Sequence, residues 1–265
     1  MKRVRAADSH TRQPDALRRF SGPEKTPNPV QVNSPFDASA DLRDAPRSPT
    51  PVLRPKDAAT LILVRRDGAE PRLLMGRRGS GHVFMASKWV FPGGRLDRSD
   101  HTAPAARELQ PATAALLERT APPRRARALA LAAVRETFEE TGLILGRPGE
   151  GRGSGPWRDF LGQGVLPDLQ PLSFIARAIT PPGRARRFDV RFFLAEAAAL
   201  ASLEPGPGCG ELDEIAWIPI SQTKGFDLPA ITRFVVQEAA ARLEEPDRPI
   251  PFVRMVRGKH EVGTV

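Results

Sequence analysis

The sequence predicts an α/β fold, with one domain over residues 57–265. Strand-like and helix-like segments alternate from residue 58 onward, which is typical of α/β proteins. With 265 residues, 40% of them hydrophobic, the chain is long enough for one enlarged domain with a packed core. Residues 1–56 instead combine many prolines with scattered charge and no hydrophobic periodicity, so we expect a mostly disordered tail.

The predicted domain begins with β-structure. Residues 59–64 (ATLILV) form an apolar run typical of a buried strand, and the turn Asp67-Gly68 separates this run from a second strand at 72–76. A short strand should end at Phe91, because Pro92-Gly93-Gly94 interrupts it. Later apolar runs predict strands at 172–179, 190–194 and 215–218, and a strand-like tail from residue 249.

Helical patterns fill the middle and the end of the domain. We expect a helix at 103–119 with Thr102 as its N-cap, and the pair Pro122-Pro123 prevents its continuation. A second helix at 126–141 should end at Gly142, because glycine favours the left-handed conformation of a C-terminal cap. The glycine-rich stretch 146–155 predicts a flexible loop, and a last helix is expected at 228–244.

The composition limits the possible partners. The formal net charge is +9, but the predicted tail carries 11 Lys and Arg against 6 acidic residues, so about half of the charge lies outside the domain. The tail has only Phe20 and Phe36 as aromatic residues, so we do not expect nucleic-acid binding. A single cysteine, Cys209, excludes an internal disulfide framework. Without a secretory signal or a long apolar run, we expect a cytoplasmic protein that does not contact membranes.

The helix predicted at 126–141 carries the most informative motif. Because each residue turns a helix by about 100°, Glu136, Glu139 and Glu140 lie within a narrow arc of one face. Such carboxylates repel one another unless cations neutralise them, and hard oxygen donors on one rigid face suit Mg²⁺ or Mn²⁺. Arg135 could orient one of these carboxylates. The alternative is a solvated, glutamate-rich helix surface with an Arg135–Glu139 pair.

This motif resembles the Nudix box, whose second half has the pattern R-E-U-x-E-E-x-G-U, where U is apolar. Residues 135–143 read RETFEETGL, with Thr137 at the first apolar position, and Phe91-Pro92-Gly93-Gly94 matches the usual entry to the box. Gly94 and Arg135 are 41 residues apart, against 14 in the standard box, so an insertion at about 98–125 separates the halves. Asp97 and Asp100 are the candidates for the first glutamate of the box.

The split box resembles the subgroup that contains the peroxisomal acyl-coenzyme A diphosphatases. Segments 73–78 (LLMGRR) and 186–193 (RRFDVRFF) resemble this subgroup as well. The resemblance implies a Nudix-type α/β/α sandwich with a mixed β-sheet, and an inserted helix within the box. It also implies hydrolysis of a diphosphate linked to another moiety with Mg²⁺ or Mn²⁺, and dimers are common in the superfamily.

The resemblance also implies roles for individual residues. Glu139 and Glu140 would be catalytic metal ligands, and Glu136 would be a further ligand or the group that handles the proton of the attacking water. Arg135 would orient these carboxylates. A further metal-binding carboxylate could come from Glu211 or Glu214, or from the aspartates Asp97 and Asp100. The substrate-binding candidates are Arg77, Arg78, Phe84, Gly93, Gly94 and Arg187.

The substrate stays open at this stage. Coenzyme A or acyl-coenzyme A is one prediction, and ADP-ribose, NADH, a nucleotide sugar or a dinucleoside polyphosphate are alternatives. A non-catalytic Nudix-like binding or regulatory module is an alternative of another class. The three mutually repelling glutamates argue against it, because a binding module has no need of them.

Overall fold

The computed structural model describes residues 36–38, 41, 53–79, 87–206 and 208–265. Most of the predicted tail and Phe84 therefore lie outside the described residues. Residues 36–265 form one unit by their contacts. Within that unit, the described part of the chain contains no helix with the length and apolar character needed to cross a bilayer.

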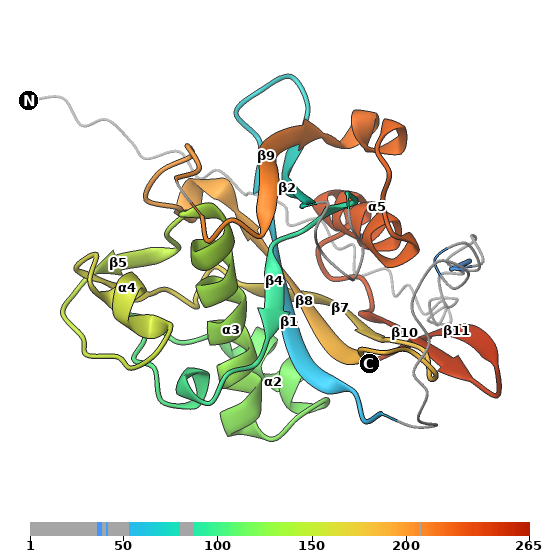
Figure 1. The fold of residues 1–265 in the computed structure, drawn as a ribbon, viewed down its shortest axis with the longest axis horizontal. Coiled ribbons are helices and arrows are strands. Elements are labelled where there is room, and N and C mark those ends of the chain that lie inside the picture. Colours follow the sequence, from blue (N-terminus) through green and yellow to red (C-terminus); the bar gives the residue numbers. More distant parts are fainter. Residues whose placement is uncertain (1–35, 39–40, 42–52, 80–86, 207) are drawn as a thin grey trace, which may run out of the picture. The chain divides into compact units, whose positions relative to one another are not determined.

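A mixed β-sheet runs through this unit, in the order β11-β10-β7-β8-β1-β2-β3 (Figure 1). The central strand β1 (Lys56–Arg65) pairs in parallel with β8 (Phe188–Glu196) and antiparallel with both β2 (Arg72–Arg78) and β4 (Gly93–Arg95). The remaining strands are β3 (Trp89–Val90), β7 (Ser173–Ile179), β9 (Leu212–Pro219), β10 (Pro251–Val256) and β11 (Lys259–Thr264). All predicted strands are confirmed, and the strand-like tail is the hairpin β10–β11.

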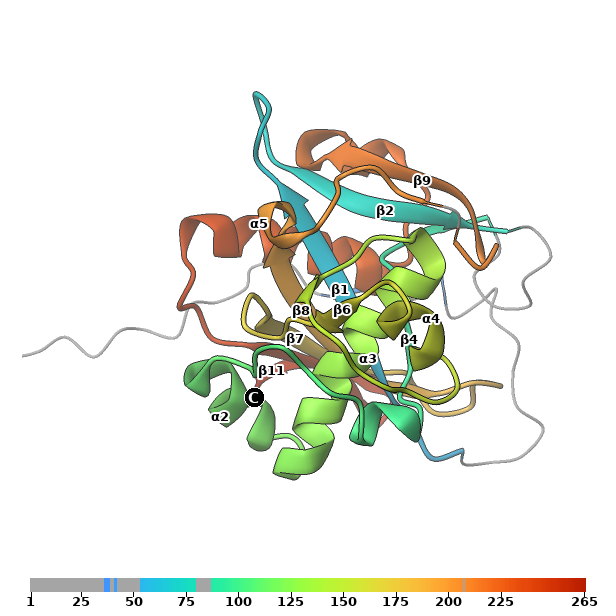
Figure 2. The same cartoon turned by 90° about the vertical axis from the view of Figure 1, so that its left-hand side faces the viewer.

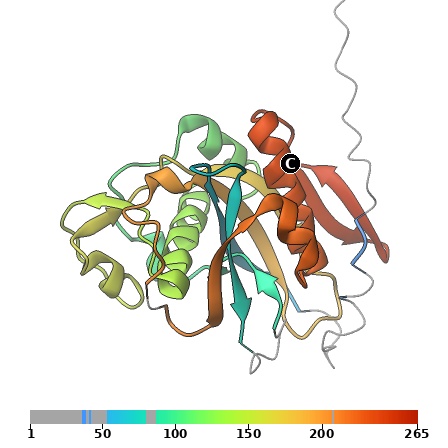
Figure 3. The same ribbon diagram turned by 90° about the horizontal axis from the view of Figure 1, so that it is seen from above.

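Helices cover both faces of the sheet. Helix α2 (Pro111–Glu118), helix α3 (Pro123–Thr141) and helix α4 (Trp157–Leu161) lie on one side (Figure 2). Helix α5 (Ala230–Glu244) lies on the other side (Figure 3). Successive side chains of a strand point to opposite faces, so β1 supplies Leu61 and Leu63 to the core under α3, and Ile62 and Val64 to the core under α5.

Two helix predictions are confirmed and one needs correction. The helices ending at Thr141 and Glu244 have the expected ends, and Gly142 has the left-handed φ of +71° predicted for a cap. The helix predicted at 103–119 instead begins at Pro111. The preceding residues are held by the neighbouring chain, where the backbone N–H of Ala106 donates to the carbonyl of Pro167.

The stretch predicted as a flexible loop is partly ordered structure. It begins with β5 (Gly146–Pro148), which pairs with β6 (Val165–Pro167) in a separate two-stranded sheet. Between these strands lies α4, which the sequence analysis did not predict. Its five residues are too short to show helical periodicity, although Trp157 and Phe160 are both buried.

Part of the segment before β1 contacts the sheet. The ring of Phe36 meets Phe234 and His260 edge-on, with centroid distances of 5.8 and 5.1 Å. The carboxylate of Asp41 accepts a hydrogen bond of 2.6 Å from the backbone N–H of Ala230, at the start of α5. The domain boundary at residue 56 stays a prediction, but these two residues pack against α5 and β11.

Candidate functional site

The last turns of α3 carry the three glutamates beside strand β4 (Figure 2). Earlier in the helix a run of buried alanine and leucine side chains packs on the sheet, and this packing fixes which face the glutamates share. The side chains of Glu136 and Glu139 are 15% and 29% exposed, while Glu140 is buried. The predicted arc of carboxylates is therefore present, at a half-buried end of the helix.

Two glycines let β4 approach these carboxylates closely. A Cβ atom on Gly94 would lie 2.4 Å from the carboxyl carbon of Glu136, so no larger residue fits without moving that side chain. The backbone N–H of Gly93 donates to Oε2 of Glu140 over 3.2 Å. The Gly93-Gly94 pair thus contacts the carboxylate cluster through backbone atoms, as expected from the sequence.

Arg135 lies at the centre of the cluster and is 3% exposed. Its Nη1 donates to Oε1 of Glu136 over 2.9 Å and to both carboxylate oxygens of Glu139 over 3.2 Å. On its other side, Nε and Nη2 hold the carboxylate of Asp100 over 2.8 and 3.0 Å, and Nη2 also donates to the carbonyl of Arg95. The planar guanidinium therefore links two of the glutamates to the chain that follows β4.

The two aspartates predicted as candidate metal ligands both have other partners. Asp100 is fully buried, and its oxygens accept hydrogen bonds from Arg135, from Nε1 of Trp157 and from the backbone N–H of Asp97. Asp97 is exposed, and its Oδ1 accepts from the N–H and the hydroxyl of Ser99. Hydrogen bonds from Ser99 lower the pKa of Asp97. This geometry favours Asp100 as the equivalent of the first glutamate of the motif and does not support direct metal binding by either aspartate.

The cluster holds more negative charge than its arginine neutralises. Burial raises the pKa of Glu136 to about 7, although Arg135 acts in the opposite direction. Burial, together with the charges of Glu136 and Glu211, raises the pKa of Glu140 well above its usual range. Carboxylates in this state are stabilised by an additional cation.

The loop before β9 closes the end of α3. The backbone N–H of Cys209 donates to the carbonyl of Glu139 over 2.6 Å, and Gly206 donates to the carbonyl of Thr141. This places Glu211 near Glu140, and Nη2 of Arg78 lies 3.6 Å from the Glu211 carboxylate. The structure therefore brings Glu211 and Arg78, two of the predicted site residues, to the cluster.

Three other residues predicted for the site, Arg77, Glu214 and Arg187, have partners other than the glutamates of α3. Arg77 pairs with Glu214 across β2 and β9, with 3.4 Å between Nη2 and Oε2, and both side chains are exposed. Arg187 directly precedes β8, and its guanidinium donates to the carbonyls of Thr180 and Leu53. It does not contact the carboxylates of α3. The prediction that Arg187 binds substrate is thus not supported by its position.

The carboxylate oxygens of the site determine whether it suits Mg²⁺ or Mn²⁺. Among the described residues, no three His, Cys, Asp or Glu side chains already surround one point as metal ligands would. Arg135 draws Glu136 and Glu139 toward itself, whereas Glu140 accepts a hydrogen bond from Gly93. The donors nevertheless fit a hard divalent cation, since they are carboxylate oxygens with surplus negative charge. To bind one ion together, Glu136 and Glu139, which are partly exposed, would rotate toward the buried Glu140.

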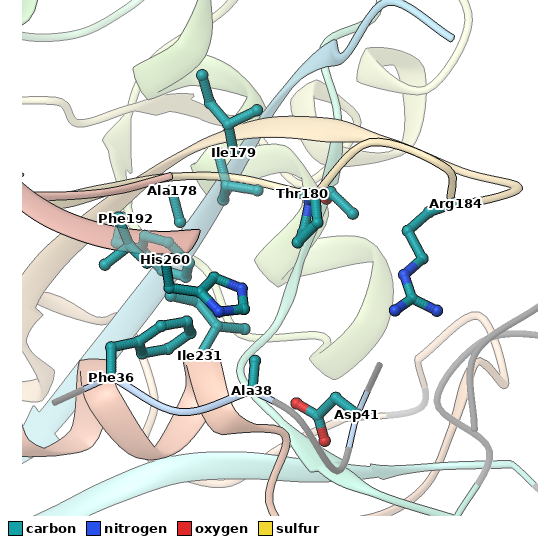
Figure 4. A pocket seen from close by; sticks show the side chains of 13 residues that line it. Phe36, Ala38, Asp41, Ala178, Ile179, Thr180, Arg184, Phe192, Ile231 and His260 are labelled. Carbon is teal, nitrogen blue, oxygen red and sulfur yellow. The ribbon is translucent and has the colours of Figure 1, made fainter. Parts of the chain in front are cut away.

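A separate hollow lies on the opposite side of the sheet, beside the first turn of α5, which contributes Ile231 to its lining (Figure 4). This cavity of about 120 Å³ is lined mainly by apolar side chains. Phe36, Phe192 and His260 gather at one end, and Asp41 and Arg184 lie at the other (Figure 4). It contains none of the α3 carboxylates, so it is distinct from the candidate site.

Comparisons with known proteins point to one superfamily. The chain is 31% identical to an acyl-coenzyme A diphosphatase of Gallus gallus, NUDT19, over 46% of this chain. The match spans 47% of that relative, about half its length. A crystal structure of a NUDIX hydrolase from Alicyclobacillus acidocaldarius superposes with a TM-score of 0.52 and 29% identity, covering 70% of this chain and 91% of the other. No family model matches the chain.

Proposed function

This chain belongs to the Nudix hydrolase superfamily, and we propose that it hydrolyses a diphosphate linked to another moiety with the help of Mg²⁺ or Mn²⁺. One observation carries the proposal above the others. Glu136, Glu139 and Glu140 lie on one face of α3 beside a glycine pair, at a site whose negative charge exceeds that of its arginine. Burial of Glu140 beside other acids raises its pKa, and perturbed carboxylates of this kind are common at functional sites.

The proposed chemistry addresses the stability of a diphosphate. Its anionic oxygens repel nucleophiles, and a bound divalent metal neutralises them and lowers the pKa of a coordinated water. We propose Glu139 and Glu140 as metal ligands, with Glu136 as a ligand or as the group that takes the proton of the attacking water. We favour Glu211 over Glu214 as the further ligand, because the charge of Glu211 acts on Glu140 whereas Glu214 pairs with Arg77.

The remaining residues would bind and orient. Arg135 holds Glu136 and Glu139 in place through one guanidinium edge, so its proposed role is positioning. Arg78 lies near the charges of Glu140 and Glu211 and is our first choice for contacting a substrate phosphate. Gly93 and Gly94 supply close backbone approach without side chains.

Coenzyme A or acyl-coenzyme A is the substrate we favour. Support comes from the diphosphatase of Gallus gallus, although the match covers only about half of either chain. ADP-ribose, NADH, nucleotide sugars and dinucleoside polyphosphates remain the alternatives. We also propose a cytoplasmic location and a homodimer. The proposed domain covers residues 57–265, with an insertion at about 98–125.

A substrate panel tests both levels of the proposal. The purified full chain is incubated with coenzyme A, an acyl-coenzyme A, ADP-ribose, NADH and a dinucleoside polyphosphate, each with Mg²⁺ or Mn²⁺, and the products are separated by chromatography. We expect turnover of at least one compound and its loss in Glu139→Gln and Glu140→Gln. Inert coenzyme A beside rapid turnover of another compound would refute the substrate only. No turnover in any reaction would favour the non-catalytic module.

A further inference from the structure

We propose that Trp157 is a positioning residue of this carboxylate site, acting through Asp100 and Arg135 on Glu136 and Glu139. The inference rests on the proposed function, because it concerns how the chain holds the residues that we assign to the metal. It assigns a role to helix α4 and to the segment around it, which joins β5 to β6.

A continuous path of hydrogen bonds supports this role. Nε1 of Trp157 donates to Oδ1 of Asp100 over 2.8 Å, and Asp100 accepts from Nε and Nη2 of Arg135. Nη1 of the same guanidinium then reaches Glu136 and Glu139. Trp157 and Asp100 are 1% and 0% exposed, so water cannot replace the indole donor.

A second contact fixes where the indole lies. The ring of Trp157 packs edge-on against Phe160, with 5.3 Å between centroids, and Phe160 packs in the same way against Phe138 over 5.2 Å. Phe138 belongs to α3 and directly precedes Glu139. The loop before α4 also covers the indole, since a Cβ on Gly153 would lie 2.9 Å from Cβ of Trp157. Helix α4 is therefore held against α3 by packing as well as by the hydrogen bond.

The indole N–H affects how strongly Arg135 and a cation compete for the oxygens of Glu136 and Glu139. Oδ1 of Asp100 receives both the indole N–H and Nε of Arg135, and these two donors set the plane of the carboxylate. If the indole donor is lost, Asp100 keeps its bonds from Arg135 and from the N–H of Asp97, but Oδ1 loses one of its two donors and holds Arg135 less firmly. The guanidinium can then move toward Glu136 and Glu139 and compete with a cation for their oxygens. The indole N–H should therefore strengthen metal binding without touching the metal.

Two substitutions separate the hydrogen bond from the packing. Trp157→Phe keeps an aromatic ring against Phe160 but has no N–H. Trp157→His removes the benzene ring of the indole but keeps a ring N–H two bonds from Cγ, where Nε1 of tryptophan lies. Binding of Mn²⁺ to the purified, substrate-free chain is measured from the paramagnetic resonance signal of free Mn²⁺, at a temperature where each variant is folded.

We expect Trp157→Phe to weaken Mn²⁺ binding by about tenfold, the lower end of the range for groups that orient metal ligands. Trp157→His should stay close to the wild-type affinity, although it loses more packing. Thr113→Val serves as the matched control, because it removes another buried hydrogen bond, from the Thr113 hydroxyl to the Leu172 carbonyl. Its Mn²⁺ affinity should not change.

Unchanged Mn²⁺ affinity in Trp157→Phe, or a greater loss in Trp157→His than in Trp157→Phe, would overturn the proposal. Asp100→Asn tests the same path if the phenylalanine variant does not fold, since asparagine keeps an acceptor for the indole but loses the charge that holds Arg135. We expect it to bind Mn²⁺ more weakly than wild type, and equal binding would refute the path. Glu140→Gln distinguishes a failure of this hydrogen-bond path from a failure of the proposed metal site. If that variant also binds Mn²⁺ normally, the metal site itself is wrong.

Discussion

Two arginines of this domain, Arg135 and Arg191, are almost completely buried, and each is surrounded by acidic side chains. They are 3% and 2% exposed. Arg135 is bonded to three carboxylates, those of Asp100, Glu136 and Glu139. Arg191 contacts Asp57 and Asp189, and Arg177 shares the Asp189 carboxylate.

Their surroundings shift the two pKa values in opposite directions. Burial lowers the pKa of Arg191, and its acids do not compensate, since Arg177 adds a like charge. Burial also disfavours the charged form of Arg135, but the hydrogen bonds to Asp100 and the charges of the glutamates outweigh it and raise its pKa. Around Arg191 two acids, Asp57 and Asp189, face two arginines, so no negative charge is in excess, as in a structural network. Around Arg135 negative charge is in excess, which is the condition for binding a cation.

The largest expected effect follows from removing the excess charge. Glu140→Gln should lower kcat/KM on the best substrate of the panel on the order of 10³-fold, or about 4 kcal/mol, because a metal ligand is lost. In the absence of metal the same variant should unfold at a higher temperature than wild type, because a buried charge without a paired cation has been removed. Steady-state kinetics and thermal unfolding with a chelator present measure the two effects.

Glu118→Gln is the matched control for this prediction, because Glu118 is exposed at the end of α2. Neither kinetics nor unfolding temperature should change in it. A Glu140→Gln variant that unfolds earlier than wild type in chelator would contradict the excess of negative charge on which the comparison depends.

Replacing an acid by its amide in the network around Arg191 should instead lower the stability of the fold. Asp189→Asn leaves Arg191 and Arg177 with too few acids in a buried site, which should cost about 3 kcal/mol of unfolding free energy. Urea unfolding at neutral pH measures this. Asp67→Asn is the control, since Asp67 also bridges two arginines, Arg65 and Arg72, but on the exposed surface. Because water screens that cluster, the control should change little, and equal losses would remove the distinction between the two kinds of network.

Metal addition should distinguish the two networks directly. A ligand at a hundred times its Kd stabilises the native state by about 2.7 kcal/mol, so Mn²⁺ should raise the unfolding temperature of the wild type. Asp189→Asn should gain the same increment from its lower starting point, whereas Glu140→Gln should gain little. Scanning calorimetry with and without Mn²⁺ tests this. An equal gain in all three proteins would place the cation elsewhere.

The sequence was informative where one element carries the chemistry. The helical period brings Glu136, Glu139 and Glu140 to one face, and Gly142 ends the helix as predicted. The sequence could not show which aspartate, Asp97 or Asp100, pairs with Arg135, because Asp100 and Arg135 are 35 positions apart in the chain. Trp157 could not be found at all, since its role depends on how a five-residue helix packs against α3.

Local sequence patterns are a poor guide where tertiary contacts decide the structure. Residues 103–110 have a helix-compatible sequence, but the backbone there pairs with the chain after β6, as in the bridge between Arg107 and Asp168. Glycines at 146–155 indicated flexibility, yet Gly146 begins a strand and Gly153 packs on α4. Arg187 was assigned to substrate because it lies in a basic motif, and only the structure shows its hydrogen bonds to the carbonyls of Thr180 and Leu53.

The smallest expected effect concerns a third buried cluster, in which one acid faces two arginines. Asp168 is buried, accepts from Nε of Arg107 over 2.9 Å and from Nε of Arg147 over 3.0 Å, and joins the residues before α2 to the end of β6. Burial alone would raise its pKa, but the hydrogen bonds from the two arginines lower it below the ordinary value of 3.8. Asp168 therefore stabilises the fold fully above that value, and this contribution is lost as the pH falls through the lower, native pKa.

Asp168→Asn should cost about 1 kcal/mol at pH 7, because both arginines are partly exposed and their charge-assisted bonds are screened. The difference from wild type should shrink below pH 3.8 and disappear at lower pH, which urea unfolding at a series of pH values can follow. Asp247→Asn, at an exposed position, should show no such pH dependence. A difference that stays constant into acid would mean that Asp168 acts by its shape rather than its charge. Charge balance would then be a poor guide to the roles of the other two clusters as well.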